Sequence, residues 1–379
     1  MKLRRLGKTD LMVSEIGFGC TYFRTIDDDE YDRLLTTGIA AGMNIMDVCI
    51  SEPGPRDKMG KAIKGRRDKL ILQGHIGLTY EDGQYSRTQD LEKSKKHMDD
   101  LFERLGTDYI DIAMLHCIDS IAEYEEAVKT GLIDYMLEQK QKGIFRYLGF
   151  SSHDPETSTV MVNSGHFDVV MFSINPLFDL VLNDMKRFFS RATEGALPKD
   201  LNVDAKRAAF YALCEEKGVG ITVMKGLGAG TLVNPDETPF ASAMTVSQCV
   251  HYALNRPGVD SVLIGLKTEA QLIEALHYFD ADASELDYSE ILSSITGSES
   301  IRCLYCNHCL PCPSKIDIGA LTRILDSGSI ELTDALHQEY ANLPHKASQC
   351  IQCKACMARC PFGIDVVANM EKAVAMFEQ

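Results

Sequence analysis

The sequence contains no run of apolar residues near the roughly 18 that a membrane-spanning helix needs. Its start, MKLRRLGKTD, carries charge without the apolar segment of a secretory signal. We therefore expect a cytoplasmic protein with no membrane partner. Basic residues are also scarce, since 39 Lys and Arg stand against 55 Asp and Glu and give a net charge of −16. Such a chain is a poor partner for nucleic acid or for an anionic membrane.

Cysteine is scarce in most of the chain and dense at its end. Five of the 13 cysteines fall in the first 290 residues, and the other eight fall in residues 291–379. Thiols stay reduced in the cytoplasm, so a group of cysteines there indicates metal ligands rather than disulfides. The five scattered cysteines have no ligand spacing, and we expect buried apolar thiols at Cys20, Cys49, Cys117, Cys214 and Cys249.

Short apolar runs, each followed by a segment of helical character, recur along the first 290 residues. They are rich in Val, Ile and Leu without alternation, which is typical of parallel strands covered on both faces. In one helical segment, the apolar residues at 98, 101, 102 and 105 form a stripe that ends at Gly106. Eight strand–helix units in about 250 residues predict an α/β fold, a (β/α)8 TIM barrel, rather than an open doubly wound sheet. The runs span 15–19, 44–49, 69–76, 109–116, 145–151, 168–173, 220–225 and 259–265.

The alternation of predicted strands and helices is interrupted by one insertion and ends before the C-terminal part of the sequence. Residues 176–203 are too long for a plain connection between the sixth and seventh strands. A substrate-side loop at the mouth of the barrel is one interpretation of this insertion, and a surface excursion is the other. After about residue 290 the alternation stops. We therefore predict two domains, a barrel over 1–290 and a mostly helical domain over 291–379.

The predicted second domain contains two copies of a cysteine motif, CLYCNHCLPCPSKIDI at 303–318 and CIQCKACMARCPFGIDV at 350–366. The second copy has the C-x2-C-x2-C-x3-C-P spacing of ferredoxins, in which three cysteines hold one cluster and the fourth reaches another. Zinc also binds C-x2-C pairs, but the double run favours iron–sulfur chemistry. We predict a helical 4Fe-4S ferredoxin-like domain that holds two [4Fe-4S] clusters by crossed ligation. One cluster uses Cys303, Cys306, Cys309 and Cys360, and the other uses Cys350, Cys353, Cys356 and Cys312.

Six stretches of the first 290 residues resemble the aldo/keto reductase family, in the family's order: RRLGKTDLMVSEIGFG, AGMNIMD, GKAIKGRRDKLIL, RLGTDYIDIAMLH, FRYLGFSSH and NRPGVDSVLIGLKTEAQL. The resemblance implies a barrel oxidoreductase that acts on carbonyls or alcohols with NADP(H), with its site at the C-terminal ends of the strands. The family's catalytic tetrad is an aspartate, a tyrosine, a lysine and a histidine. Asp47 matches the aspartate, and His116 matches the histidine.

Two members of that tetrad have no match in this chain. Glu52 stands where the resemblance places the tyrosine, and His75 stands where it places the lysine. In the family the lysine lowers the pKa of the tyrosine, which protonates the carbonyl oxygen, so the loss of one makes the other useless. We expect a catalytic site of Asp47, His75 and His116 with Glu52 nearby, in which either histidine can act as a general acid.

Two alternatives remain for the chemistry of this site. Tyr80 or Tyr85, in the loop after the third strand, can substitute for the lost tyrosine, although both also fit as ordinary loop residues. Two histidines and one carboxylate also resemble the open triad of non-haem iron sites.

The resemblance places NADP(H) on residues that follow the fifth to eighth strands, because a barrel commonly holds phosphate groups there. Pro176 stands where the family has a glutamine, so the binding of NADP(H) stays open. The segment GLGAG after a strand is not a Rossmann fingerprint, since no second βαβ unit follows it. The cofactor positions are Ser151, Ser152, Asn175, Gly226, Gly228, Gly265, Lys267 and Gln271.

A nicotinamide gives two electrons together as hydride, whereas a cluster passes one at a time, so exchange between them needs a mediator such as flavin. Three functions are therefore open. The first, favoured by the loss of the tyrosine and the lysine, is an iron–sulfur oxidoreductase. Its clusters pass electrons to or from a small organic substrate or cofactor at the barrel mouth, with a carrier such as ferredoxin or flavodoxin. The second is an NADPH-dependent carbonyl reductase with an accessory ferredoxin module, and the third is a non-catalytic electron carrier or redox sensor.

Overall fold

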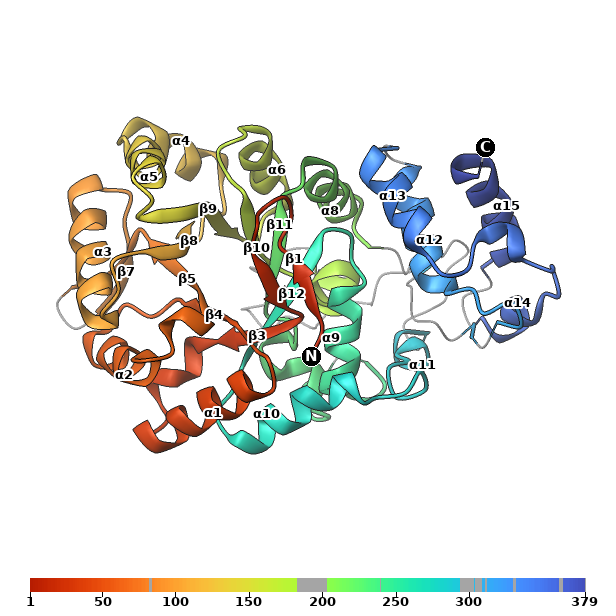
Figure 1. Ribbon diagram of the computed structural model, residues 1–379, viewed down its shortest axis with the longest axis horizontal. Coiled ribbons are helices and arrows are strands. Elements are labelled where there is room, and N and C mark those ends of the chain that lie inside the picture. Colours follow the sequence, from red (N-terminus) through yellow and green to blue (C-terminus); the bar gives the residue numbers. More distant parts are fainter. Residues whose placement is uncertain are drawn as a thin grey trace. The chain divides into compact units, whose positions relative to one another are not determined.

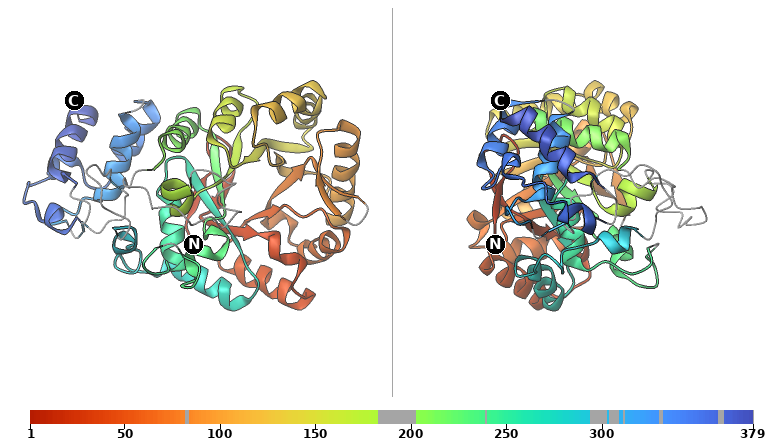
Figure 2. Two further views of the ribbon diagram at one scale, coloured as in Figure 1. Left: turned by 180° about the vertical axis from the view of Figure 1, so that it is seen from behind. Right: turned by 90° about the vertical axis from the view of Figure 1, so that its right-hand side faces the viewer.

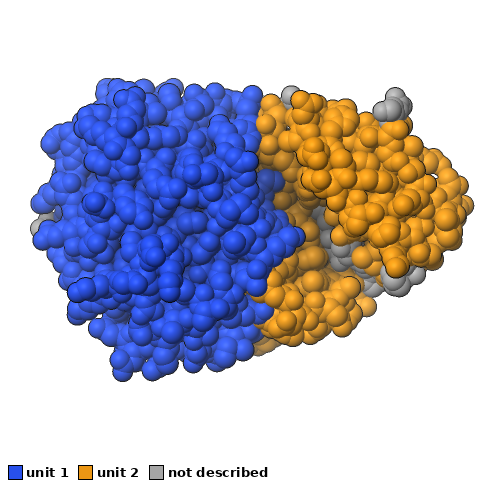
Figure 3. All heavy atoms as spheres, in the orientation of Figure 1, with its two compact units in different colours: residues 1–173, 217–226, 258–276 blue, residues 174–216, 227–257, 277–379 orange. Residues whose placement is uncertain are grey.

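The computed structural model describes residues 1–81, 84–182, 203–238, 240–293, 303, 309–310, 312–329, 332–360 and 364–378. The chain divides into two compact units, coloured separately in Figure 3. Unit 1 comprises residues 1–173, 217–226 and 258–276, and unit 2 comprises residues 174–216, 227–257 and 277–379. Unit 2 combines the cysteine-rich tail with segments from the first 290 residues. The domain boundary at residue 290 therefore stays a prediction.

Eight parallel strands close into a barrel within unit 1, as the sequence predicts (Figure 1). Their order around the barrel is β10-β11-β12-β3-β4-β5-β8-β9, so consecutive barrel strands of the chain are neighbours. The closed order excludes an open doubly wound sheet. Each strand coincides with one of the eight predicted apolar runs: β3 (Ile16–Gly19), β4 (Ile45–Val48), β5 (Ile71–Ile76), β8 (Ile110–Leu115), β9 (Phe145–Ser152), β10 (Val169–Ser173), β11 (Gly220–Met224) and β12 (Val259–Gly265).

Helices of unit 1 surround the strands, as Figure 2 shows from behind. The helix with the predicted apolar stripe, α3, begins where the Asp90 carboxylate accepts from the Lys93 backbone N–H at 2.8 Å. It ends at Gly106, whose φ of +63° is a left-handed conformation that favours glycine. The helices before residue 294 are α1 (Asp28–Ala40), α2 (Pro53–Ile63), α3 (Leu91–Leu105), α4 (Ile121–Lys129), α5 (Leu132–Gln141), α6 (Pro155–Asn163), α8 (Ala205–Lys217), α9 (Val246–Leu254), α10 (Glu269–Leu276) and α11 (Ser289–Ser293).

A hairpin of β1 (Leu3–Arg5) and β2 (Met12–Ser14) covers the N-terminal end of the barrel. The Lys8 backbone N–H donates to the carbonyl oxygen of Gly218 at 2.8 Å, just before β11 begins. Apolar side chains of the hairpin pack among residues of the barrel interior, so this end of the barrel is filled. The opposite, C-terminal end is therefore the place for a site. The packed side chains of the hairpin are Leu6, Leu11 and Val13.

Several short elements were not predicted from the sequence. A second hairpin, β6 (Leu78–Glu81) with β7 (Gln84–Arg87), follows β5. The predicted insertion 176–203 begins with a π-helix, η3, and its residues 183–202 lie outside the described part of the chain. Its interpretation as a substrate-side loop stays a prediction. The single-turn helices are η1 (Cys20–Arg24), η2 (Arg67–Lys69), η3 (Leu177–Leu182), η4 (Gly228–Val233), η5 (His277–Phe279) and η6 (Ala347–Gln349).

Asp179, on the π-helix, is a buried carboxylate that joins three elements of unit 2. Its Oδ1 accepts from Arg207 Nε at 2.8 Å and from the Tyr211 hydroxyl at 2.6 Å. Its Oδ2 accepts from the Tyr252 hydroxyl at 3.0 Å. The carboxylate and the guanidinium are both almost fully buried, so each compensates the charge of the other.

We expect Asp179→Ala to lower the free energy of unfolding by about 3–5 kcal/mol, because it removes a buried carboxylate whose oxygen lies 2.8 Å from Arg207 Nε. The shift of the urea midpoint of the full chain measures this loss. Asp134 is exposed on α5, so Asp134→Ala is the matched control and should change stability by no more than about 0.5 kcal/mol. Equal midpoints for the two variants would contradict the role of Asp179.

The described tail is mostly helical, as predicted. Its helices share one apolar core, in which Leu321 and Ala373 are fully buried. Within the described residues, no helix has both the length and the apolar character to span a membrane. The helices of the tail are α12 (Ile318–Gly328), α13 (Asp334–Asn342), α14 (Ala355–Arg359) and α15 (Val366–Phe377).

Candidate active site

Three predicted catalytic residues lie at the C-terminal ends of neighbouring barrel strands. Asp47 lies near the end of β4, His75 near the end of β5, and His116 directly after β8. The strands β4, β5 and β8 are adjacent and parallel, so these ends meet at one side of the barrel mouth. The sequence order of these strands is thus what brings the residues together.

The three side chains form a hydrogen-bonded chain. His75 Nε2 lies 2.9 Å from Asp47 Oδ1, and His75 Nδ1 lies 2.8 Å from His116 Nδ1. The two nitrogens of His75 therefore face different partners, and the three groups do not converge on one point. This geometry fits a proton relay, and it does not fit an iron-binding triad of the same residues.

The neighbouring Gln73 indicates which nitrogen of His75 carries a proton. The Gln73 amide nitrogen donates to Asp47 Oδ1 at 3.1 Å, while its oxygen accepts from the Thr222 hydroxyl at 2.9 Å. Asp47 is 1% exposed, and its Oδ1 serves as an acceptor. His75 therefore carries a proton on Nε2, which it donates to Asp47. Sequence reasoning missed Gln73, although it lies on a predicted strand two residues before His75.

The two histidines differ in their exposure to solvent. His75 is 3% exposed, whereas His116 is half-buried at the outer end of the chain. Burial, and after it the neighbouring His75 and Arg87, hold the pKa of His116 well below its usual value. At neutral pH the His116 ring is therefore uncharged. Of the two histidines that the sequence offered as acids, His116 is the more exposed, and its role as an acid stays a prediction.

Glu52, which the resemblance places at the position of the family tyrosine, forms an ion pair with an arginine. It lies at the N-terminus of α2, where its Oε1 pairs with Arg24 Nη1 at 3.0 Å. Tyr80 and Tyr85 are partners in the β6–β7 hairpin. The arrangement does not support a catalytic role for Glu52, which stays a prediction.

A second polar chain, which sequence reasoning missed, follows the ends of β8, β9 and β11. His153 Nδ1 lies 3.1 Å from Asp119 Oδ2, and His153 Nε2 lies 2.9 Å from Lys225 Nζ. The Cys117 thiol donates to the same Asp119 oxygen at 3.4 Å, and burial raises the pKa of this thiol to about 11. The available signal was the position of these polar residues directly after predicted strands.

The residues predicted for NADP(H) fall into a buried group and an exposed group. The buried side chains form hydrogen bonds with the loops that follow the strands. Ser151 Oγ accepts from the Cys117 backbone N–H at 2.7 Å, and Ser152 Oγ donates to Asp119 at 3.2 Å. In unit 2, Asn175 Oδ1 accepts from the Phe178 backbone N–H at 3.0 Å and so begins the π-helix. These buried hydroxyl and amide groups serve the protein fold directly.

The exposed members of the predicted NADP(H) site lie after β12. Lys267 Nζ lies 4.5 Å from the centre of the Tyr22 ring, and the Lys267 backbone N–H donates to Gln271 Oε1 at 2.8 Å. A Cβ at Gly265 would lie 2.9 Å from that same ring, so only glycine fits there. Gly226 and Gly228 also have no room for a side chain, with contacts at 2.9 Å. Lys267 and Gln271 are thus the exposed groups suited to a phosphate, and the site stays a prediction.

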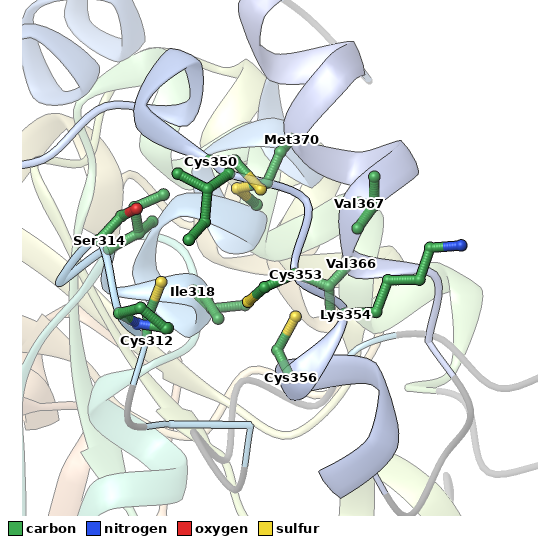
Figure 4. Close-up of a pocket in the computed structure, with 13 residues that line it drawn as sticks. Cys312, Ser314, Ile318, Cys350, Cys353, Lys354, Cys356, Val366, Val367 and Met370 are labelled. Atoms are coloured by element: carbon green, nitrogen blue, oxygen red, sulfur yellow. The ribbon is translucent and has the colours of Figure 1, made fainter.

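Four cysteines from the two motifs line one pocket of unit 2 (Figure 4). Cys312 comes from the first motif, and Cys350, Cys353 and Cys356 come from the second. This is the set that crossed ligation assigns to one cluster. The other walls are largely apolar, with Ile316, Ile318, Val366 and Met370 among them.

The loop of the second motif contains two residues in the left-handed conformation and donates a backbone hydrogen bond to one cysteine sulfur. Gln352 and Lys354 have φ values of +52° and +59°, and the Gln352 backbone N–H donates to Cys350 Sγ at 3.4 Å. A single zinc ion would need its sulfur ligands within about 4 Å of one another. Among the described residues, no three of these cysteine sulfurs lie within 4.8 Å of one another. The donor set therefore fits an iron–sulfur cluster better than one zinc ion.

The other predicted ligands are described only in part. Cys309 is 9% exposed in the core of the tail, and Cys303 and Cys360 are half-buried. Cys306 lies outside the described residues. Of the five scattered cysteines, Cys20, Cys214 and Cys249 are buried as expected, whereas the prediction of burial is wrong for Cys49 and Cys117, which are partly exposed.

Two family models match the chain. The aldo/keto reductase family model matches residues 15–251, and the model of a 4Fe-4S dicluster domain matches residues 302–365. The first match spans more than half of the chain, and the second contains all eight predicted cysteine ligands.

Curated relatives and solved structures are similar to the barrel. The oxidoreductase YqkF of Bacillus subtilis (strain 168) is 28% identical over 77% of this chain and 94% of its own length. L-galactose dehydrogenase of Arabidopsis thaliana is 24% identical over 72% of this chain and 86% of its own. The holo form of aldo-keto reductase AKR11C1 from Bacillus halodurans has a TM-score of 0.59 at 23% identity, over 78% of this chain and 96% of that one.

Proposed function

Because this chain belongs to the aldo/keto reductase family and also carries a 4Fe-4S dicluster domain, we propose that it is an iron–sulfur oxidoreductase with electron transfer at the barrel mouth. Its clusters would exchange single electrons with a small organic substrate or cofactor there. The observation that carries this proposal is the hydrogen-bonded chain Asp47–His75–His116. The resemblance to the family implies that Glu52 and His75 replace its tyrosine and lysine.

The hydrogen-bonded chain of Asp47, His75 and His116 can hold an added proton in two positions, and this is its chemical role. With His75 neutral, its Nδ1 accepts from His116 Nδ1–H, and His116 Nε2 carries a lone pair. When His75 gains a second proton, its Nδ1 donates to His116, and the proton of His116 lies on Nε2 instead. Asp47 stabilises the charged His75 at 2.9 Å. A proton taken up inside the site is therefore delivered to the substrate at His116 Nε2.

The eight motif cysteines support two clusters with crossed ligation, one of them at the pocket of Cys312, Cys350, Cys353 and Cys356. When bound, the clusters supply single electrons. Burial raises the pKa of the Cys356 thiol, and the neighbouring Cys350 and Cys353 raise it further, so iron binding must release protons. Such reduced thiols fit a cytoplasmic location, and a ferredoxin or flavodoxin is a suitable external carrier.

The electron donor tests this function directly. We expect the anaerobically reconstituted full-length protein to reduce small aldehydes with reduced methyl viologen, a single-electron donor, and to lose this activity in Cys353→Ala. The spectrum of the clusters should not bleach when NADPH is added alone, because hydride donors and clusters need a mediator. Stopped-flow spectroscopy measures both reactions.

A second function, an NADPH-dependent carbonyl reductase with an accessory ferredoxin module, is favoured by the dehydrogenase among the curated relatives and by the common use of NADP(H) in the family. Lys267 and Gln271 would then contact the cofactor. NADPH-driven turnover that is unchanged in Cys353→Ala would establish this function and overturn the first. A flavin at the barrel mouth would show as flavin absorbance in the purified protein.

A further inference from the structure

The second polar chain lies at the same barrel mouth as the first and has no role in the function described so far. It consists of Asp119, His153 and Lys225, which follow β8, β9 and β11. The Asp119 carboxylate also accepts from the His153 backbone N–H at 2.7 Å and from the Ser152 hydroxyl at 3.2 Å. A carboxylate with this many donors is built to stay ionised.

The protonation of this chain follows from its geometry. Burial opposes ionisation of Asp119, but hydrogen bonds from the His153 side chain and backbone and from the Cys117 thiol outweigh it and lower the pKa of the carboxyl. An ionised Asp119 accepts the proton on His153 Nδ1, so a neutral His153 presents a lone pair at Nε2. That nitrogen accepts from Lys225 Nζ at 2.9 Å. This hydrogen-bonded chain therefore ends at the amine of Lys225, whose position is fixed by His153 and, through it, by Asp119.

Lys225 is held in an unusual conformation and environment. Its φ of +57° is left-handed, a costly conformation for a lysine that is typical of functional sites. Burial lowers the pKa of Lys225 to about 8, although the neighbouring Cys117 and Asp119 raise it. Among the described residues, titratable groups that face it include Cys117, Asp119 and His153, from the loops after β8 and β9. An amine of this kind both gives and regains a proton near neutral pH.

Electron balance shows that a carbonyl reduction by single electrons needs a second proton. A hydride donor brings one hydrogen with its two electrons, so a carbonyl reduction by hydride needs one proton. Reduction by two single electrons needs two protons: the C=O π bond breaks, and one C–H and one O–H bond form. In the proposed function, a reduced carrier of the ferredoxin class supplies the electrons, and one proton comes from His116.

We propose that Lys225 donates the second proton, so that the Asp119–His153–Lys225 chain and the Asp47–His75–His116 chain together complete a two-electron, two-proton reduction of a carbonyl compound. This inference rests on the proposed function. The two chains adjoin, because His116 and Cys117 are consecutive and the Cys117 thiol contacts Asp119 at 3.4 Å. A lysine that only neutralised Asp119 would pair with it directly, whereas His153 stands between them. The neutral Lys225 regains its proton from solvent.

The acidity of Lys225 can be measured without turnover. In the cluster-loaded full-length protein, the rate of acetylation of Lys225 by acetic anhydride, followed by peptide mass spectrometry across pH, should titrate near pH 8. The exposed Lys129 serves as the internal reference for the reactivity of the reagent. Asp119→Asn should lower the titration point of Lys225, because it removes an attractive negative charge. An ordinary value for Lys225, or no response to Asp119→Asn, overturns the inference.

Turnover tests the catalytic role. With reduced methyl viologen and an aldehyde, Lys225→Met should lower kcat by about 10²-fold or more while dithionite still reduces the clusters. Wild-type kcat should fall above about pH 8, since the amine must be protonated to donate, and Lys129→Met should keep that profile. Viologen-driven, cluster-dependent turnover that survives Lys225→Met overturns this inference alone. Wild-type protein without cluster-dependent turnover overturns the proposed function, and with it the catalytic role of Lys225.

Discussion

Replacement of Cys312 by alanine is expected to remove one whole iron–sulfur cluster and the single-electron activity of the protein. Cys312 lies in the pocket of Cys350, Cys353 and Cys356, although it belongs to the other sequence motif. A cubane cluster that loses one of its four thiolates loses most of its stability, so iron content should fall by about half. Iron analysis and electron paramagnetic resonance of the dithionite-reduced protein measure the loss.

Paired variants make this prediction specific for crossed ligation. Cys312→Ala and Cys353→Ala should remove the same resonance signal, and Cys303→Ala and Cys360→Ala should remove the other. Cys249 is a fully buried thiol outside both motifs, so Cys249→Ala is the control and should keep all of its iron. If Cys312→Ala and Cys303→Ala remove the same signal, each motif holds its own cluster and the crossed ligation is wrong.

Replacement of His116 by asparagine should lower kcat of viologen-driven reduction by about 10²–10⁴-fold, the usual contribution of a general acid. Asparagine can still form a hydrogen bond to His75, but it cannot carry a proton from His75 to the substrate. Because the side chains are similar in size, we expect KM to change little. Steady-state kinetics at matched iron content separates the two constants.

The control for His116 is a histidine on the protein surface. His277 is about half-exposed and pairs with Glu285 at 2.9 Å, so His277→Asn should keep full turnover. A kcat for His116→Asn equal to that of the control would exclude His116 as the proton donor. An increase in KM with unchanged kcat would assign His116 to substrate binding instead.

The barrel was predictable because each of its strands is marked by a short run of neighbouring apolar residues. Each parallel strand is covered on both faces, so it reads as a continuous apolar run, as in Ile110–Leu115, and all eight runs are strands. The helical tail and its motifs were predictable for the same reason, since two-residue spacers between cysteines are visible in the chain itself. The β6–β7 hairpin was not, because strands of four residues have too little periodicity.

The candidate catalytic site was predictable only as a set of residues. The end of a predicted strand indicated Asp47, His75 and His116, but not that His75 lies between the other two. Gln73 and Thr222 are 149 positions apart, and only barrel closure brings them together behind Asp47. Lys225 joins His153 across 72 positions in the same way.

The sequence by itself determined the barrel, its family and the eight cysteines, because strand burial and ligand spacing are properties of neighbouring residues. The tertiary structure placed Cys312 in one pocket with Cys350, Cys353 and Cys356, as predicted. It alone decided that His75 lies between Asp47 and His116, and that Glu52 pairs with Arg24. These are relations between distant segments, which barrel closure and helix packing fix. A hydrogen bond depends on tenths of an ångström, and no local pattern of residues carries that information.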